Sequence, residues 1–198
     1  MIVVDIEASG TDPKKHSLVS IGAVDFLNPE REFYEECRIW DGAHVMPEAL
    51  AVNGFSEKEI INPSRKDEGD IAKSFLSFAL ASEEHTLAGQ NPSFDRDFIR
   101  SAIERVHGNW VLPYRTIDLH SLCWMHMIKS GYTVPHKHKR SDLNSDTILR
   151  YVGLLDEPKP HHALTGARME AESFSRLLFN KSLLEAFKDF PIPWLGSS

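Results

Sequence analysis

Residues 1–27 are MIVVDIEASGTDPKKHSLVSIGAVDFL, and this stretch contains two segments that are typical of buried β-strands. Valine and isoleucine dominate residues 1–6 and 17–27, and β-branched side chains favour strands. Between them, residues 9–13 (SGTDP) combine the glycine, aspartate and proline that favour a turn. With a third strand expected at residues 33–39, the order strand, turn, strand, turn, strand predicts an antiparallel meander.

After this meander the pattern changes to helices that alternate with short strands. The combination predicts an α/β fold with a mixed sheet, antiparallel over its first three strands and parallel afterwards, flanked by helices. A basic, irregular loop is expected at residues 131–140 (GYTVPHKHKR), and an extended, non-helical tail from Asp189, where two prolines occur. Helices are expected at residues 47–52, 67–81, 92–107, 120–129, 142–151 and 163–179, and short strands at 86–88 and 116–119.

The length and composition are those of one ordinary globular domain. The chain has 198 residues, of which 41% are hydrophobic and 26% charged, so a single domain over 1–198 can bury a sizeable core. The two cysteines, Cys37 and Cys123, are too few for a disulfide framework. The first residues lack the basic region of a signal peptide, and no apolar run reaches the length of about 18 residues that suggests a membrane span. We therefore expect a soluble, cytoplasmic protein without a membrane segment.

The charge balance bears on the kind of partner. A formal net charge of −7 counts against a wide nucleic-acid-binding surface, since such surfaces use lysine and arginine to replace phosphate counterions. An enzyme that holds only a strand end through metal ions escapes this objection, because some of its acids would be neutralised as ligands. The basic run at residues 136–140 could contact phosphates, but a solvated loop is the favoured interpretation.

Asp5 and Glu7 are the first candidate functional residues. They lie two residues apart on the first strand, so both side chains point to the same face. Two acids on a buried strand are costly unless a positive group meets them, and a divalent cation such as Mg²⁺ or Mn²⁺ prefers oxygen ligands of this kind. The alternative is that the strand ends at Ile6 and both acids are simply solvated.

Asp95 is the second candidate. A helix is expected to start at Asn91-Pro92, with the Asn91 side chain as its cap. At about 100° per residue around the helix axis, Asp95 lies at the centre of the apolar face, whereas Asp97 points to the opposite side and is expected to be solvated. An acid within a core-facing stripe breaks the local pattern, which is typical of a functional position. The apolar face comprises Phe98, Ile99, Ala102, Ile103 and Val106.

Three segments, in this order, resemble the motifs of the DEDDh-type 3′→5′ exonucleases. Residues 4–13 (VDIEASGTDP) are similar to the first motif with its Asp-x-Glu core, residues 89–95 (GQNPSFD) to the second, and residues 161–164 (HHAL) to the histidine form of the third. Weaker similarities lie at 46–56 and 114–118. The family, which includes polymerase proofreading exonucleases, ribonuclease T and oligoribonuclease, has a ribonuclease H-like fold.

The resemblance implies a metal-dependent exonuclease that removes nucleotides from the 3′ end of single-stranded DNA or RNA. It implies two divalent cations, Mg²⁺ or Mn²⁺, and phosphodiester hydrolysis by a two-metal mechanism. Asp5, Glu7 and Asp95 would be metal ligands, Glu7 would also approach the terminal 3′-hydroxyl, and His161 would be the general base. Whether the chain forms a homodimer or acts beside a polymerase is left open.

Ser9, Thr11 and Asn91 are less specific candidates for contacts with the substrate. All three have structural alternatives, because Ser9 and Thr11 can shape a turn and Asn91 can cap the helix.

The sequence departs from the family at Gly166, where the resemblance places a fourth metal-binding aspartate. Glu170 lies about 40° from Gly166 on a helical projection, one turn further on, and side chains on helices lean toward the amino terminus. Glu170 can therefore replace the missing acid. Alternatively, the fourth ligand is lost and the protein is a weakened or inactive exonuclease fold that binds nucleic acid or a protein partner. A third alternative is that Glu170 is a rim residue and water fills the ligand position.

A zinc site formed by His120, Cys123 and His126 is a rival from another class of protein. It is disfavoured because this spacing spreads the three side chains around a helix and no second pair of ligands follows.

Overall fold

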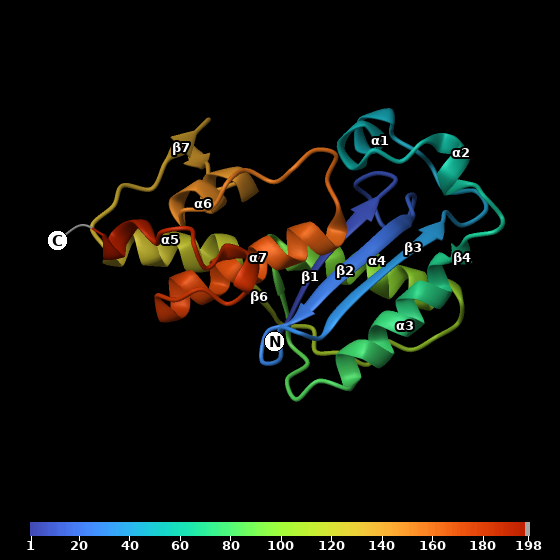
Figure 1. Cartoon of the computed structure of the whole chain (residues 1–198). Helices are drawn as coiled ribbons and strands as arrows, with labels where there is room; N and C mark the ends of the chain where they lie inside the picture. Colours follow the sequence, from blue (N-terminus) through green and yellow to red (C-terminus); the bar gives the residue numbers. More distant parts are fainter. Residues whose placement is uncertain (197–198) are drawn as a thin grey trace.

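The structure is a computed structural model that describes residues 1–196, and its centre is a six-stranded mixed sheet with helices on both faces (Figure 1). The strand order is β4-β3-β2-β1-β5-β6. The strands are β1 (Ile2–Ala8), β2 (Leu18–Asp25), β3 (Glu32–Arg38), β4 (Lys66–Asp67), β5 (Leu87–Gly89) and β6 (Thr116–Asp118). The helices are α1 (Pro47–Asn53), α2 (Glu57–Ile60), α3 (Glu68–Leu80), α4 (Pro92–Arg105), α5 (Leu119–Lys129), α6 (Ser145–Tyr151) and α7 (Ala163–Phe179).

The strand pairing confirms the mixed sheet that the sequence predicts. β1 pairs with β2 and β2 with β3 in antiparallel fashion, whereas β1 with β5, β5 with β6 and β3 with β4 are parallel. In the β1–β2 register, Asp5 lies opposite Gly22 and Glu7 opposite Ser20. In the parallel β1–β5 pair, Ile2 lies opposite Leu87 and Val3 opposite Ala88, so the carboxyl end of β5, just before α4, lies beside Val4 and close to Asp5.

The alternation of side chains along β1 divides the core into two layers. Ile2, Val4 and Ile6 pack with residues of α3 and α4, whereas Val3 packs with residues of α5, α6 and α7. Because side chains alternate along a strand, Asp5 and Glu7 share the face of Val3. Both acids therefore point toward the layer that contains α7.

α7 lies directly on the sheet. A Cβ atom at Gly22 on β2 would overlap with the main chain of Ala163, the first residue of α7, so only glycine allows this close approach. The far half of α7 is held by a fully buried ion pair between Glu172 and Arg176, 2.7 Å apart. Both partners also bond to main-chain groups of the C-terminal segment, since Leu183 donates to Glu172 and Arg176 donates to the Phe187 carbonyl.

Two sequence-based expectations for the segment between α5 and α6 and the start of α6 were wrong. α6 begins at Ser145 rather than at residue 142, because the Asn144 side chain accepts a hydrogen bond from the Thr147 N–H and caps the helix there. The stretch expected as an irregular loop contains a small hairpin, β7 (His136–Lys137) with β8 (Arg140–Ser141).

The tail expected to be extended contains the 3₁₀ turn η2 (Pro193–Leu195), preceded by η1 (Glu185–Phe187). Proline is tolerated in the first turn of a helix, and Trp194 packs there against His126 and Tyr151. Within residues 1–196, none of the helices combines the length and the apolar character that a membrane crossing requires.

We expect Glu172→Ala to lower the free energy of unfolding by about 3–5 kcal/mol, because it leaves the buried Arg176 guanidinium without its counter-charge. Glu104→Ala is the matched control, since Arg100 and Glu104 also form an i,i+4 pair but with exposed side-chain fractions of 35% and 55%; its expected loss is below about 1 kcal/mol. Chemical denaturation of the two variants measures the difference. Equal losses would show that the buried pair does not anchor α7.

Candidate active site

Four carboxylates from three elements meet at the carboxyl end of β1. Asp5 and Glu7 come from β1, Asp95 from the first turn of α4, and Glu170 from α7. Asp95 Oδ1 accepts a hydrogen bond of 3.0 Å from the main-chain N–H of Ile6, which ties α4 to β1. The structure thus brings together the four side chains that the sequence proposes as metal ligands.

Glu170 lies where the helical projection placed it. Its side chain reaches toward the end of β5, where Oε2 accepts a hydrogen bond of 3.1 Å from the main-chain N–H of Gln90. Glu170 is 8% exposed and Asp95 is 4% exposed, so both carboxylates are almost completely removed from solvent. Asp97, two residues after Asp95, is partly exposed, with 42% of its side chain accessible, and it pairs with Arg96.

Because residue 166 is glycine, the Asp5 side chain of β1 fits beneath α7. A Cβ atom at this position would overlap with Oδ2 of Asp5. The Asp5 carboxylate therefore occupies the space that a side chain at residue 166 would use. The position is not an empty gap in the site but the place where α7 and the Asp5 side chain meet.

The four carboxylates create a strongly negative electrostatic potential at this site. Burial raises the pKa of Asp5 well above its ordinary range, and the negative charges of Glu170, Asp95, Glu7 and Glu157 raise it further. Burial, followed by the charges of Glu157 and Asp95, raises the pKa of Glu7 to about 8. Burial raises the pKa of Asp95 to about 7. The folded chain thus disfavours the ionised form of each of these acids.

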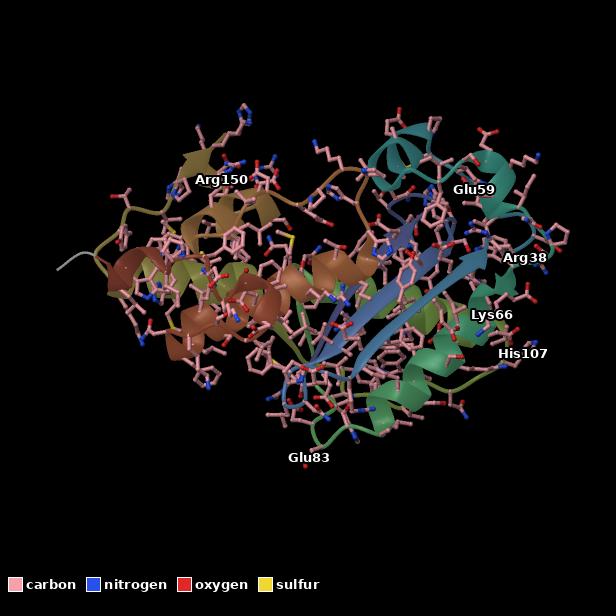
Figure 2. All side chains as sticks on the ribbon, viewed as in Figure 1. Arg38, Glu59, Lys66, Glu83, His107 and Arg150 are labelled. Atoms are coloured by element: carbon pink, nitrogen blue, oxygen red, sulfur yellow. The ribbon has the colours of Figure 1, made fainter. Side chains whose placement is uncertain are left out.

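Cationic side chains do not compensate this charge. Within the described part of the chain, Asp5, Glu7, Asp95 and Glu170 form no ion pair with lysine or arginine. Figure 2 shows Arg38, Lys66 and Arg150 at the periphery of the molecule. They pair there with other acids, namely Asp67, Glu35 and Asp156 respectively.

The donor atoms suit a hard divalent cation, although they do not yet converge on one point. Carboxylate oxygens are the ligands that Mg²⁺ and Mn²⁺ prefer. Across residues 1–196, however, no three His, Cys, Asp or Glu side chains are close enough to hold a metal ion as they stand. Asp95 and Glu170 are instead turned onto main-chain N–H groups, so a cation would require rotations of these side chains.

His161 lies just before α7, and the acid nearest to it is Glu157. Its side chain is 31% exposed, and its Nδ1 lies 3.7 Å from Oε2 of Glu157. The main-chain N–H of His161 donates to the carbonyl of Val52 in α1 at 3.0 Å. The next residue, His162, stacks on Tyr34 with ring centroids 4.3 Å apart. Of the two histidines, His161 is the one whose ring lies beside an acid, Glu157.

Glu157 is a residue that the sequence analysis missed. It lies in the connection between α6 and α7, and its charge contributes to the raised pKa of both Asp5 and Glu7. An acid in a proline-rich connection has no periodicity to mark it. Its position four residues before His161 was the only available signal.

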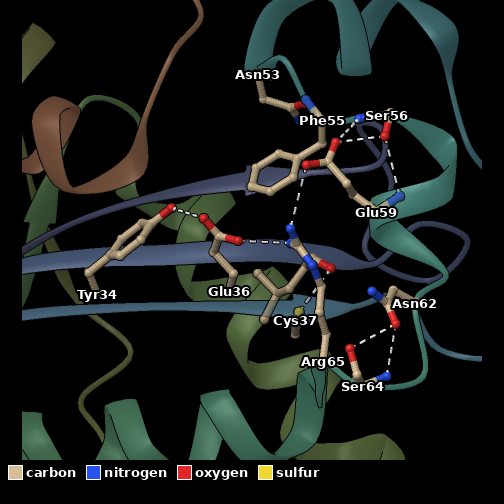
Figure 3. Close-up of polar contacts among 11 residues, drawn as sticks. Tyr34, Glu36, Cys37, Asn53, Phe55, Ser56, Glu59, Asn62, Ser64 and Arg65 are labelled. Atoms are coloured by element: carbon tan, nitrogen blue, oxygen red, sulfur yellow. Dashed lines mark hydrogen bonds and ion pairs between the residues drawn. The ribbon is translucent and has the colours of Figure 1, made fainter.

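A pocket adjoins His161 over β2 and β3, and the side chains that line it form a wall beside the site. A pocket of about 220 Å³ is lined there by His161, His162, Tyr34, Glu36 and Phe55, among others. Figure 3 shows how the wall is held: the Tyr34 hydroxyl donates to Glu36, which also pairs with Arg65 at 2.9 Å. Arg65 in turn lies over the Phe55 ring, 5.2 Å from its centroid.

The three candidate substrate contacts differ in accessibility. Thr11 is exposed, and its hydroxyl lies 3.9 Å from the Met46 sulfur. Ser9 is fully buried, and its hydroxyl donates to the His44 carbonyl and accepts from the Ser17 N–H, so it shapes the turn. Asn91 is exposed and has a left-handed backbone with φ of 59°. Its side chain makes no capping hydrogen bond, so the expected capping role was wrong, and this side chain is accessible at the start of α4.

Other candidate sites receive no support. His120 bonds to Ser141 and His126 to Tyr151, and Cys123 is buried, so the three side chains of the rival zinc site are engaged separately. A pocket of about 580 Å³ lies between α7, the C-terminal segment, the turn before β3 and the connection between α6 and α7. None of the four clustered carboxylates lines it.

Comparison with known proteins gives relatives of limited identity, and no protein-family model matches the chain. Ribonuclease T of Haemophilus influenzae is 25% identical over 138 residues, which are 61% of this chain and 59% of that protein. The PolC-type DNA polymerase III of Thermotoga maritima is 26% identical over 179 residues, which are 89% of this chain and 12% of the polymerase. The chain thus spans less than two thirds of the length of these relatives.

Among solved structures, E. coli Exonuclease I in complex with a 5cy-dT13 oligonucleotide has a TM-score of 0.70 at 15% identity, covering 90% of this chain and 41% of that one. Apo Exonuclease I gives a TM-score of 0.71 at 16% identity. At this identity the likeness concerns the fold, and it confirms the ribonuclease H-like mixed sheet expected from the sequence. The chain is thus similar in sequence to ribonuclease T and to the PolC-type polymerase, and similar in fold to Exonuclease I.

Proposed function

We propose that the chain is a metal-dependent 3′→5′ exonuclease that removes nucleotides from the end of single-stranded nucleic acid. The observation that carries the proposal is a cluster of four carboxylates, three of them buried, with no lysine or arginine paired to them in residues 1–196. His161 lies next to Glu157, whose charge acts on this cluster. The relatives agree with it, since one is named ribonuclease T and Exonuclease I was solved with an oligonucleotide.

Asp5, Glu7, Asp95 and Glu170 are the side chains that would hold the cations. Their oxygen donors and their excess negative charge fit Mg²⁺ or Mn²⁺ better than a softer metal. Two such cations would supply activation of a water molecule and charge stabilisation of the leaving 3′ oxygen. Glu170 would take over the charge that an acid at position 166 would otherwise provide.

His161 would act as the general base. Imidazole changes its protonation near neutral pH, which suits proton transfer from water. Because Nδ1 faces Glu157, Nε2 is the ring nitrogen left to accept the proton. The bond from the His161 N–H to Val52 fixes the main chain, so the ring is presented from a defined position.

Asn91 would contact the end of the substrate strand. It is exposed, it precedes the α4 turn that carries Asp95, and its side chain is not used as a helix cap. The wall formed by Tyr34, Phe55 and His162 would limit where the strand can lie on the other side of His161.

A 5′-labelled single-stranded oligonucleotide, incubated with Mg²⁺ or Mn²⁺, tests the proposal. We expect stepwise shortening from the 3′ end, and Asp95→Asn and His161→Ala should each lower its rate by about 100-fold or more. Asp97→Asn is the matched control on the same helix, and its rate should equal that of the wild type because Asp97 pairs with Arg96 and lies outside the cluster.

Binding of the oligonucleotide without hydrolysis, by folded wild-type protein and with both DNA and RNA tested, would contradict the enzymatic proposal. That result would favour the alternative of a degenerate exonuclease fold that only binds nucleic acid. Equal rates for Asp95→Asn and Asp97→Asn would contradict the assignment of Asp95.

The stability of the protein in a chelator should fall as the pH rises. The pKa of Glu7 is raised from 4.5 to about 8, and that of Asp95 from 3.8 to about 7, so the folded state binds more protons than the unfolded state between these limits. The contribution of these two acids to the free energy of unfolding is therefore fully present below their unfolded-state pKa values. It is lost as the pH rises through their folded-state pKa values. We expect the Tm in EDTA to fall between about pH 5 and pH 9.

Glu7→Gln should reduce this fall, because it removes one of the titrating groups. Mn²⁺ should oppose it in the wild type, because a ligand of the folded state stabilises that state. A Tm that is constant or rises over this range would show that the carboxylates are not destabilised by burial.

A further inference from the structure

We propose that Glu157 provides the carboxylate that α7 lacks at Gly166, and that it is a further ligand of the divalent cations. The inference rests on the proposed function, because it concerns the same site. It adds a second carboxylate to the replacement by Glu170, and Glu157 comes from the connection between α6 and α7 rather than from α7 itself.

The first argument is the placement of the Glu157 side chain. Glu157, Gly166 and Glu170 line the same small cavity, together with Leu119, Ser145, Leu149 and Met169. Gly166 has no side chain to contribute to this space, and the acid of the connecting segment faces it instead. A carboxylate thus borders the position where the family resemblance expects one, although it comes from another part of the backbone.

The second argument is an unpartnered oxygen. The Glu157 side chain is only 8% exposed, and its Oε1 is buried without a hydrogen-bond partner. Burying an acceptor without a partner costs about 1–3 kcal/mol, and more when the group is charged. A divalent cation bound between Glu157 and the neighbouring acids would satisfy this oxygen.

The third argument is the direction in which the charge of Glu157 acts. After burial, Glu157 is the largest cause of the raised pKa of Glu7, and it also raises the pKa of Asp5 and Glu170. Its carboxylate therefore faces acids of both β1 and α7. Such a group belongs to the cluster electrostatically, whatever its distance along the chain.

A purely positioning role for Glu157 toward His161 explains less. The separation of 3.7 Å between Oε2 and Nδ1 exceeds that of a hydrogen bond. This contact involves Oε2, and it leaves the buried Oε1 without a hydrogen-bond partner. The ligand role accounts for both oxygens, because Oε2 can stay near His161 while Oε1 binds the cation.

Titration calorimetry with Mn²⁺ alone on the full chain tests the proposal without relying on activity. Glu157→Gln keeps the shape of the side chain and removes its charge. We expect it to weaken Mn²⁺ binding about tenfold or more, or to abolish one of the binding events. Glu83→Gln is the matched control, because Glu83 is exposed and lies away from the site (Figure 2), and its Mn²⁺ binding should equal that of the wild type.

Thermal unfolding separates the loss of a ligand from misfolding. In EDTA, Glu157→Gln should be at least as stable as the wild type, because it removes one negative charge from the buried cluster. On addition of Mn²⁺, it should gain less stability than the wild type. If Glu157→Gln were unfolded, Glu157→Asp, which keeps the charge but shortens the reach, should show the same weakened Mn²⁺ binding.

The outcomes distinguish this inference from the proposed function. Unchanged Mn²⁺ affinity and stoichiometry in folded Glu157→Gln, with an active wild type, would overturn the ligand role of Glu157 alone. Weakened binding in this variant, with a wild type that binds Mn²⁺ but does not hydrolyse nucleic acid, would support Glu157 and contradict the proposed function. A wild type that binds no Mn²⁺ would overturn both.

Discussion

Mutual burial of carboxylates at the carboxyl end of β1 is the constraint on which the other features of the site depend. Asp5, Glu7, Asp95 and Glu170 lose hydration and repel one another, so their ionised forms oppose folding. The N–H groups of Ile6 and Gln90 offset only part of this cost. The rest is offset by apolar packing on both faces of the sheet. The fold thus keeps these acids in place at the expense of stability, which is typical of functional sites.

α7 determines how closely the acids are held. Its first turn lies on the sheet because Gly22 leaves room for Ala163, and Gly166 leaves room for the Asp5 carboxylate. Its other end is fixed by the buried pair of Glu172 and Arg176. A helix held at both ends cannot move away from like charges beneath it. The repulsion is therefore retained in the folded state and is available to favour a cation.

The sequence predicted the parts of the site that lie on regular elements. Strand alternation placed Asp5 and Glu7 on one face, and helical periodicity placed Asp95 toward the core and Glu170 near Gly166, because these residues follow a fixed geometry. The prediction failed at two helix starts, where side-chain hydrogen bonds and local backbone conformation set the first residue. Asn91 takes a left-handed conformation instead of capping α4. The Asn144 cap places the start of α6 at Ser145. The tail turned into a 3₁₀ turn because tertiary packing of Trp194 overrides the extended preference.

Glu157 was not predicted because it lies on a connecting segment rather than on a helix or strand. Its place on that segment also couples its position to that of His161. Family motifs describe ligands by their spacing along a helix or strand, so an acid supplied by a connecting segment leaves only a gap at Gly166. Glu157 and His161 are four residues apart on one segment, and the bond from His161 to Val52 ties that segment to α1. In turn, Asn53 of α1 donates to the Ala8 carbonyl at the end of β1. A ligand and a general base carried by the same tethered segment would move together, so the distance between them would be preserved even when the surrounding side chains rotate.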